Sequence, residues 1–143
     1  MIYKKILIAI GEDHSAENVA KTGLMLAKQL HAEIAVVSVA NTSNLLTDGG
    51  ITPDEMADII RRDTRESQKK ILNSVFGDVE VTHFVKEGKP HEAILKASEE
   101  WNADILVMGT HSNSGLSQVL LGSVFEKVIK TSTIPIFLVT IKE

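Results

Sequence analysis

The sequence predicts an α/β protein with a single open, mostly parallel five-stranded sheet and helices on both faces. Short, β-branched apolar runs alternate with segments of helical spacing, which is the order expected of parallel strands joined by crossover helices. The runs are continuously apolar, as in strands that are covered on both faces. No internal repeat, low-complexity tract or linker divides the chain, so residues 1–143 are interpreted as one domain.

The first half of the chain contains two expected strands and two expected helices. Residues 6–10 form the first strand, and residues 15–30 repeat apolar side chains at the spacing of one helical face. A second strand at 34–39 precedes a polar loop. Thr52-Pro53-Asp54-Glu55 then predicts a helix start, since threonine can cap, proline suits the first turn and Glu55 completes a capping box. We expect this helix to continue to Val75.

The second half continues the alternation. Ser123-Val124-Phe125-Glu126 matches another capping box and predicts a helix start at Ser123. The remaining elements are expected in this order: strand 79–85, a helix opened by Gly88-Lys89-Pro90, strand 105–108, a helix from Ser123 to about Thr131, and strand 134–140.

Composition excludes several classes of function. The formal net charge of -4 argues against a nucleic-acid partner, which would require clustered positive charge. The absence of cysteine removes disulfides, thiolate nucleophiles and zinc-thiolate sites. No apolar run approaches the ~20 residues of a membrane span. We therefore expect a cytoplasmic protein that binds neither nucleic acid nor membrane.

The loops that follow three of the strands are the candidate ligand site. In open parallel sheets, a ligand binds beyond the carboxyl ends of the strands, where the winding direction reverses. The loops in question are residues 11–14, 40–44 and 109–115.

The last of these loops is punctuated by glycine. Gly109 follows a buried strand, Gly115 lies in the loop, and Gly122 precedes the predicted helix start at Ser123. Glycines and a helix N-terminus can aim several N–H groups at a phosphate. On these residues alone, however, a plain turn and a plain cap are the commoner interpretation. Neither a Walker loop, a G-x-G-x-x-G motif nor a G-x-S-x-G elbow is present.

The carboxyl-terminal third carries a family resemblance. Its sequence "ILVMGTHSNSGLSQVLLGSVFEKVIKTSTIPIFLV" closely resembles the universal stress protein family. The upstream stretch "EGKPHEAILKASEEWNADILVMGT" and the first strand "KKILIAI" resemble the same family. The resemblance covers essentially the whole chain and implies a Rossmann-like fold.

Nucleotide-binding members of that family carry G-x-x-G, nine residues, then G-[ST]. Gly109 matches the first glycine and Gly122-Ser123 match the last pair, while Ser112 replaces the second glycine. The resemblance implies that ATP, accompanied by Mg2+, is the cofactor, with the phosphates near these residues and adenine near the backbone of Val39. The candidate binding residues are Ile10, Gly11, Asp13, Val39, Met108, Gly109, His111, Ser112, Gly115, Gly122, Ser123 and Val124.

Two departures from the family pattern bear on this site. A left-handed conformation at Ser112 would cost roughly 1–2 kcal/mol, although its hydroxyl could donate to a phosphate. Relatives usually have an aspartate directly after the first strand, whereas here Gly11 comes first and Glu12-Asp13 follow. Asp13 either reaches the adenosine or caps the first helix.

The resemblance implies a sensor or regulator in stress response that binds an adenine nucleotide. The alternative is a nucleotide-independent protein-interaction module with a decayed ATP site. A hydrolase or kinase ranks last, because its motifs are missing. No residue has the setting of a hydrolytic base, and we expect any ATP turnover to be slow or absent.

The last strand suggests a partner. Residues 134–139 are apolar on both faces, yet Pro135 lacks the N–H that a central strand donates, which favours an edge position. An exposed apolar edge is either covered by the protein's own elements or paired with another strand. We favour a homodimer that pairs the strand around Ile134–Val139 with its copy, as the resemblance also implies.

Overall fold

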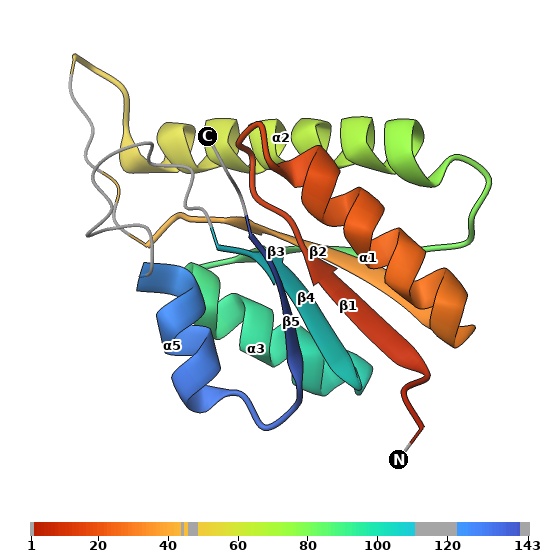
Figure 1. Cartoon of the computed structure of the whole chain (residues 1–143). Helices are drawn as coiled ribbons and strands as arrows, with labels where there is room; N and C mark the ends of the chain where they lie inside the picture. Colours follow the sequence, from red (N-terminus) through yellow and green to blue (C-terminus); the bar gives the residue numbers. More distant parts are fainter. Residues whose placement is uncertain (1, 44, 46–48, 111–122, 141–143) are drawn as a thin grey trace.

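A computed structural model describes residues 2–43, 45, 49–110 and 123–140 of the chain (Figure 1). The described strands form one sheet in the order β3-β2-β1-β4-β5, and each neighbouring pair is parallel. The predicted open α/β architecture is therefore confirmed. The elements are β1 (Lys5–Ala9), α1 (Ala16–Leu30), β2 (Glu33–Ala40), α2 (Pro53–Ile71), η1 (Leu72–Phe76), β3 (Thr82–Glu87), α3 (Pro90–Trp101), β4 (Ile105–Gly109), α5 (Ser123–Thr131) and β5 (Ile136–Val139).

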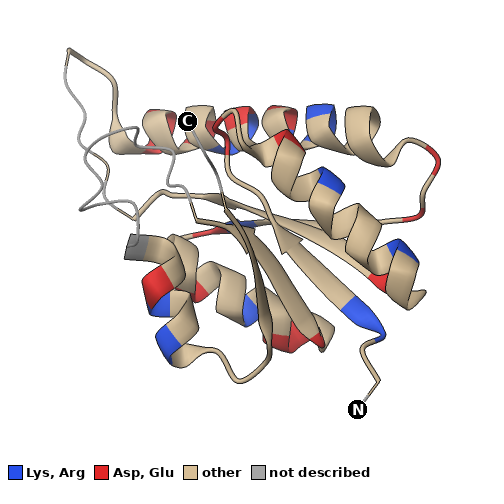
Figure 2. Cartoon of the chain, viewed as in Figure 1, with Lys and Arg blue, Asp and Glu red and all other residues tan. Residues whose placement is uncertain are grey.

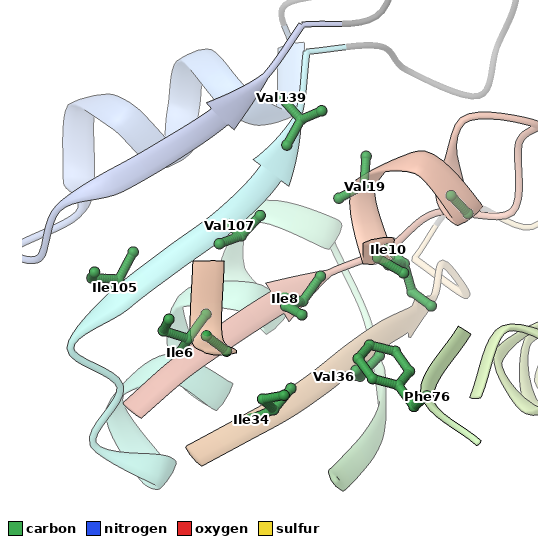
Figure 3. Packing of buried hydrophobic residues seen from close by; sticks show 13 residues of the cluster. Ile6, Ile8, Ile10, Val19, Ile34, Val36, Phe76, Ile105, Val107 and Val139 are labelled. Carbon is green, nitrogen blue, oxygen red and sulfur yellow. The ribbon is translucent and has the colours of Figure 1, made fainter. Parts of the chain in front are cut away.

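The central strand β1 has apolar side chains on both faces of the sheet. Ile6 and Ile8 pack in one core layer, with residues of α1 and with Phe76 at the end of η1 (Figure 3). Leu7 and Ala9 pack in the opposite layer, with residues of α3 and α5. Because successive side chains of a strand point to opposite faces, cover on both faces requires the continuous apolar run that the sequence contains.

The predicted start of α2 is confirmed. Glu55 N donates to Thr52 Oγ1 over 3.1 Å, and Thr52 N donates to Glu55 Oε1 over 3.2 Å, which closes the capping box. The end of the helix differs from the prediction, because α2 gives way after Ile71 to the π-helical turn η1. Gly77 N donates to Leu72 O over 3.2 Å, and Phe76 is only 3% exposed.

Two strands begin later than the sequence suggests. β3 begins at Thr82 and not at Val79, because Val79 N donates to Phe76 O in the turn that leaves η1. β5 begins at Ile136 and not at Ile134, because the backbone N–H and C=O of Ile134 both bond the Ser132 hydroxyl. Pro135, which lies between Ile134 and Ile136, has no N–H to donate to a neighbouring strand. The edge position expected for this strand is confirmed.

Charged side chains of both signs are mixed along the helices (Figure 2). Among the described residues, no helix combines the length and apolarity that crossing a membrane would require.

Gly23 of α1 lies against the central strand, which leads to a stability prediction. A Cβ at Gly23 would stand 2.5 Å from Ile8 Cδ1 and 2.7 Å from Ile8 Cγ1, and Ile8 is fully buried. Overpacking costs about 1–3 kcal/mol, whereas alanine gains about 1 kcal/mol over glycine in a helix. We expect Gly23→Ala to lower the free energy of unfolding by about 1 kcal/mol in urea denaturation.

The control for this prediction is the same substitution in an Ile8→Ala background. That background removes the atoms that Gly23→Ala would strike, so the added methyl group should be neutral or stabilising there. An equal loss in both backgrounds would show that the contact with Ile8 is not the cause.

Candidate functional site

A cavity of about 430 Å³ opens at the carboxyl end of the sheet, where β1 is flanked by β2 on one side and by β4 on the other. From β1 the chain builds β2 and β3 on one side of the sheet, and it then crosses over to build β4 and β5 on the other side of β1. The winding direction therefore reverses at β1, which makes this end of the sheet the topological switch point. The walls come from the ends of these strands, from α2, and from the first turns of α3 and α5.

Most of the predicted site residues that the structure describes line this cavity. Those residues are Ile10, Gly11, Asp13, Val39, Met108, Gly109 and Val124. His111, Ser112, Gly115 and Gly122 lie outside the described residues. Ser123 is the first residue of α5, but its side chain belongs to the part that is not described.

The backbone of Val39 faces the cavity. Ile10 N donates to Val37 O over 3.0 Å, so the backbone groups of Val37 point toward β1. Backbone direction alternates along a strand, and Val39 therefore directs its N–H and C=O the same way. The last β1–β2 pair is Ala9 with Val37, so β1 has already ended at this level. One donor and one acceptor are thus directed into the space beyond β1.

The backbone of Gly109 faces the same space from the other side. Leu106 N donates to Pro135 O, and Thr110 N donates to Val139 O, so these two residues of the β4 segment point toward β5. Gly109 therefore points toward β1, beyond the last β1–β4 pair of Ile8 with Val107. The first turn of α5 contributes Val124 and Phe125 to the same wall, with the positive end of its dipole at the cavity.

Asp13 lines the cavity and also organises the start of α1. Its Oδ1 accepts from Ser15 N over 2.9 Å and from the Ser15 hydroxyl, and its carbonyl accepts from Ala16 N over 3.2 Å. Asp13 therefore lines the cavity, but the alternative that it caps the first helix is wrong: the N-cap of α1 is Ser15, and Asp13 instead holds the turn that leads into the helix. Its other oxygen, Oδ2, lies 3.9 Å from where a Cβ on Gly11 would be.

The α2 wall of the cavity is the part that the sequence analysis missed. Ile60 and Thr64 line it, and Thr64 is only 1% exposed, with its hydroxyl donating to Ile60 O over 2.8 Å. Ser38 lines it from β2, and accepts from Gln68 Nε2 over 3.1 Å. The sequence did contain a signal for this wall. Thr64 and Gln68 lie on the same helical face as the apolar residues Ala57 and Ile60, which indicates polar side chains on the face that packs against the sheet.

Other lining residues come from β1 and β2, from the loops that follow these strands, and from α1, α3 and α5. The sequence analysis did not assign them individually to the site. They are Ala9, Glu12, Ser15, Val19, Val37, Asn41, Pro90, Ile94 and Phe125.

An ion pair ties α2 to the carboxyl end of β3 at this edge of the sheet. Arg61 Nε donates to Glu87 Oε2 over 2.6 Å, and Arg61 also pairs with Asp58 over 2.8 Å. The hydrogen bond from Arg61 lowers the pKa of Glu87, and the same bond raises the pKa of Arg61. Thr42 Oγ1 donates to Glu87 Oε1 over 3.3 Å and attaches the loop after β2.

Within residues 2–43, 45, 49–110 and 123–140, no three histidine or acidic side chains converge in a way that could hold a metal ion. The described part of the cavity thus offers backbone donors and acceptors, apolar walls and the two carboxylates of Glu12 and Asp13.

These features define an open parallel α/β protein with a ligand cavity at its switch point. Comparison with known proteins then identifies the family. A profile of the universal stress protein family matches residues 2–140. Universal stress protein MJ0531 of Methanocaldococcus jannaschii is 33% identical over 144 residues, which cover 96% of this chain and 82% of that protein. Universal stress protein YxiE of Bacillus subtilis is 30% identical over 148 residues, covering 96% and 99%. The chain belongs to the universal stress protein family.

Solved structures agree with this assignment. The structure of MJ0577 from Methanocaldococcus jannaschii superimposes with a TM-score of 0.77 at 28% identity, covering 100% of this chain and 99% of that one. A universal stress protein in complex with cAMP has a TM-score of 0.64 at 18% identity, covering 98% of each chain. A universal stress protein of Archaeoglobus fulgidus in complex with dAMP has a TM-score of 0.63 at 23% identity, covering 96% and 98%. The last two likenesses show the shared fold.

The contacts of Asp13 lead to a second prediction. Asp13→Ala removes the acceptor for the Ser15 N–H and hydroxyl, and we expect a loss of about 0.5–1.5 kcal/mol in the free energy of unfolding, the usual net value of a lost hydrogen bond. Asp13→Asn keeps an acceptor oxygen and should retain most of the stability. Urea denaturation of both variants measures the difference.

Glu12→Ala is the matched control, since Glu12 is the neighbouring exposed acid on the same cavity wall. It should leave stability within about 0.5 kcal/mol of the parent protein. A loss for Glu12→Ala as large as that for Asp13→Ala would contradict a role specific to Asp13 in the turn before α1.

Proposed function

We propose that this protein binds an adenine nucleotide, ATP accompanied by Mg2+, in the cavity beyond β1, and acts as a nucleotide-dependent regulator or sensor in stress response. The observation that carries the proposal is the pair of strand ends at Val39 and Gly109, which extend past the last pairs with β1 and direct backbone groups into one cavity from opposite sides of that strand. A volume of about 430 Å³ is also within the range of small-molecule sites.

Adenine would lie at the β2 side. The base presents a ring nitrogen that accepts next to an amino group that donates, and the N–H and C=O of Val39 form the complementary pair. Backbone recognition of this kind needs no particular side chain at position 39. The apolar residues Ile10, Ile94 and Met108 line the same cavity and suit the faces of a planar base.

The phosphates would lie at the β4 side. The amino end of α5 and the backbone of Gly109 are positive or donor groups in the described part of that wall. Glu12 and Asp13 are on the β1 side, where a carboxylate accepts from ribose hydroxyls and would repel a phosphate. The magnesium ion would arrive with the triphosphate, as no metal cluster exists among the described side chains.

Two solved family members, described as complexes with cAMP and with dAMP, support an adenine nucleotide as the ligand class. Binding without rapid hydrolysis would make the protein a sensor. The cavity's described carboxylates are Glu12 and Asp13, and Asp13 Oδ1 already accepts two hydrogen bonds.

Calorimetric titration with ATP and magnesium tests the proposal. We expect saturable binding by the parent protein, and equal or tighter binding by Ser112→Gly, which restores the glycine of the family motif. A hundredfold excess of ATP over Kd should raise the free energy of unfolding by about 2.7 kcal/mol.

Gly11→Leu is the blocking variant for the same titration. Among the described residues, a Cβ at Gly11 meets only Asp13 Oδ2, at 3.9 Å, so the substitution can be accommodated, and Gly11 lines the cavity that the larger side chain is meant to obstruct. We expect this variant to bind ATP about tenfold more weakly or worse and to keep its unfolding free energy.

Binding by Ser112→Gly alone would identify Ser112 as the lesion of a decayed site. Binding by neither Ser112→Gly nor the parent would favour the protein-interaction module.

We further infer a homodimer through β5. This strand lies at one edge of the described sheet, and Ile136 and Leu138 point their backbone groups away from β4, since Val139 O accepts from Thr110 N. Phe137 is 41% exposed beside that edge. Antiparallel pairing of two copies of β5 would cover the apolar edge and extend the sheet.

Sedimentation equilibrium of a Phe137→Lys variant tests the dimer. Lysine on an edge strand opposes edge-to-edge pairing, so we expect dissociation to become about tenfold more favourable. Met25→Lys on α1 is the control, because Met25 is a more exposed apolar residue, at 63%, on a different element. A monomeric parent protein, or equal dissociation in the two variants, would contradict a β5 interface.

A further inference from the structure

A second groove lies at the other edge of the sheet, away from the proposed nucleotide site. It runs between α2 and the edge strand β3 and encloses about 600 Å³. In Figure 1, α2 passes over the sheet on the β3 side. The lining residues are Arg65, Gln68, Lys69, Leu72, Asn73, His83 and Val85.

The two cations that line this groove, Arg65 and Lys69, have no acidic partner among the described residues. Arg61, Arg65 and Lys69 are spaced at four-residue intervals and form one row along α2. Arg61 is neutralised by Glu87 and Asp58, whereas Arg65 and Lys69 form no ion pair or hydrogen bond with the described part of the chain. Arg65 acts on Glu87 only at longer range, where its charge contributes to the lowered pKa of that carboxyl. Two exposed positive charges are therefore available over the groove.

The strand beneath these cations has an open hydrogen-bonding edge. Gly88 N donates to Ala40 O over 3.2 Å, so the even-numbered residues of this segment point their backbone groups toward β2. His83, Val85 and Glu87 consequently point theirs outward. Among the described strands, none pairs with that side of β3. Such an edge is a template for an additional strand.

The cation row and the strand edge have matching repeats. Four residues of helix advance about 6 Å, and two residues of strand advance about 6.6 Å. The ion pair between Arg61 of α2 and Glu87 of β3 is an example of this match within the protein, because an acidic side chain on the α2 face of the strand reaches a cation of the α2 row. Arg65, four residues after Arg61, and Val85, two residues before Glu87, both line the groove. Lys69 and His83, at the next such intervals, line it as well.

We propose that an extended peptide segment with acidic residues at alternate positions docks here as an added strand on β3. Its backbone pairs with the outward groups of His83 and Val85, and its acids on the α2 face pair with Arg65 and Lys69. Strand addition of this kind draws affinity from main-chain hydrogen bonds and specificity from alternate side chains. A nucleic acid would satisfy the cations but cannot pair with the strand edge, so the open edge favours a peptide.

The experiment uses a fluorescein-labelled peptide of alternating glutamate and threonine, titrated with the full-length protein and followed by fluorescence anisotropy. We expect saturable binding that weakens with salt, and no binding of the matched lysine–threonine peptide. The double variant Arg65→Glu with Lys69→Glu should bind about tenfold more weakly. The control is Arg62→Glu with Lys70→Glu, which makes the same charge change on the same helix outside the groove and should change affinity by less than about twofold.

Amide hydrogen exchange distinguishes strand addition from simple charge attraction. The acidic peptide should slow exchange at the N–H groups of His83 and Val85 and leave the N–H of Lys86, which points toward β2, unchanged. Arg65→Gln with Lys69→Gln serves as the milder variant if charge reversal perturbs folding, and should weaken binding in the same order. Equal weakening by the control pair, unprotected His83 and Val85 amides, or equal binding of a single-stranded oligothymidylate would overturn the proposal. None of these outcomes depends on ATP binding.

Discussion

The architecture depends on one constraint: the central strand β1 ends before its neighbours do. Its ladder with β2 stops at Ala9 and Val37, and its ladder with β4 stops at Ile8 and Val107. Val39 and Gly109 continue beyond those pairs, and the polar groups that would have bonded a longer β1 face a cavity instead. Backbone groups that the fold leaves without a strand partner at an open cavity are available to hydrogen-bond a ligand.

Helix α2 lines both the cavity beyond β1 and the groove beside β3. Its face toward the sheet bears Ile60 and Thr64 on the cavity wall and Gln68 below, and Gln68 Nε2 donates both to Ser38 Oγ and to Phe84 O over 2.8 Å. One buried amide therefore joins α2, β2 and β3. The same helix also forms the cationic wall of the β3 groove.

Local sequence patterns were sufficient wherever the determinants were neighbours in the chain. The capping box of Thr52 and Glu55 formed as predicted, because its donors and acceptors are three residues apart. Edge placement of β5 followed from Pro135, whose ring removes a donor in any context. The end of α2 could not be predicted in the same way. Its change to a π-helical turn coincides with the burial of Phe76 against the sheet, a contact between segments distant in sequence.

The sequence by itself determined the alternation of strands and helices, the loops that meet at the carboxyl edge, and membership of the universal stress protein family, since these depend on short-range periodicity and on motif residues. Tertiary structure alone decided which residues complete the cavity. Thr64 and Ser38 come together there because α2 crosses the face of β2, and no local signal specifies that crossing. It also decided that Arg61 pairs with an acid whereas Arg65 and Lys69 pair with none among the described residues, because the position of Glu87 is set by the register of β3 against β2.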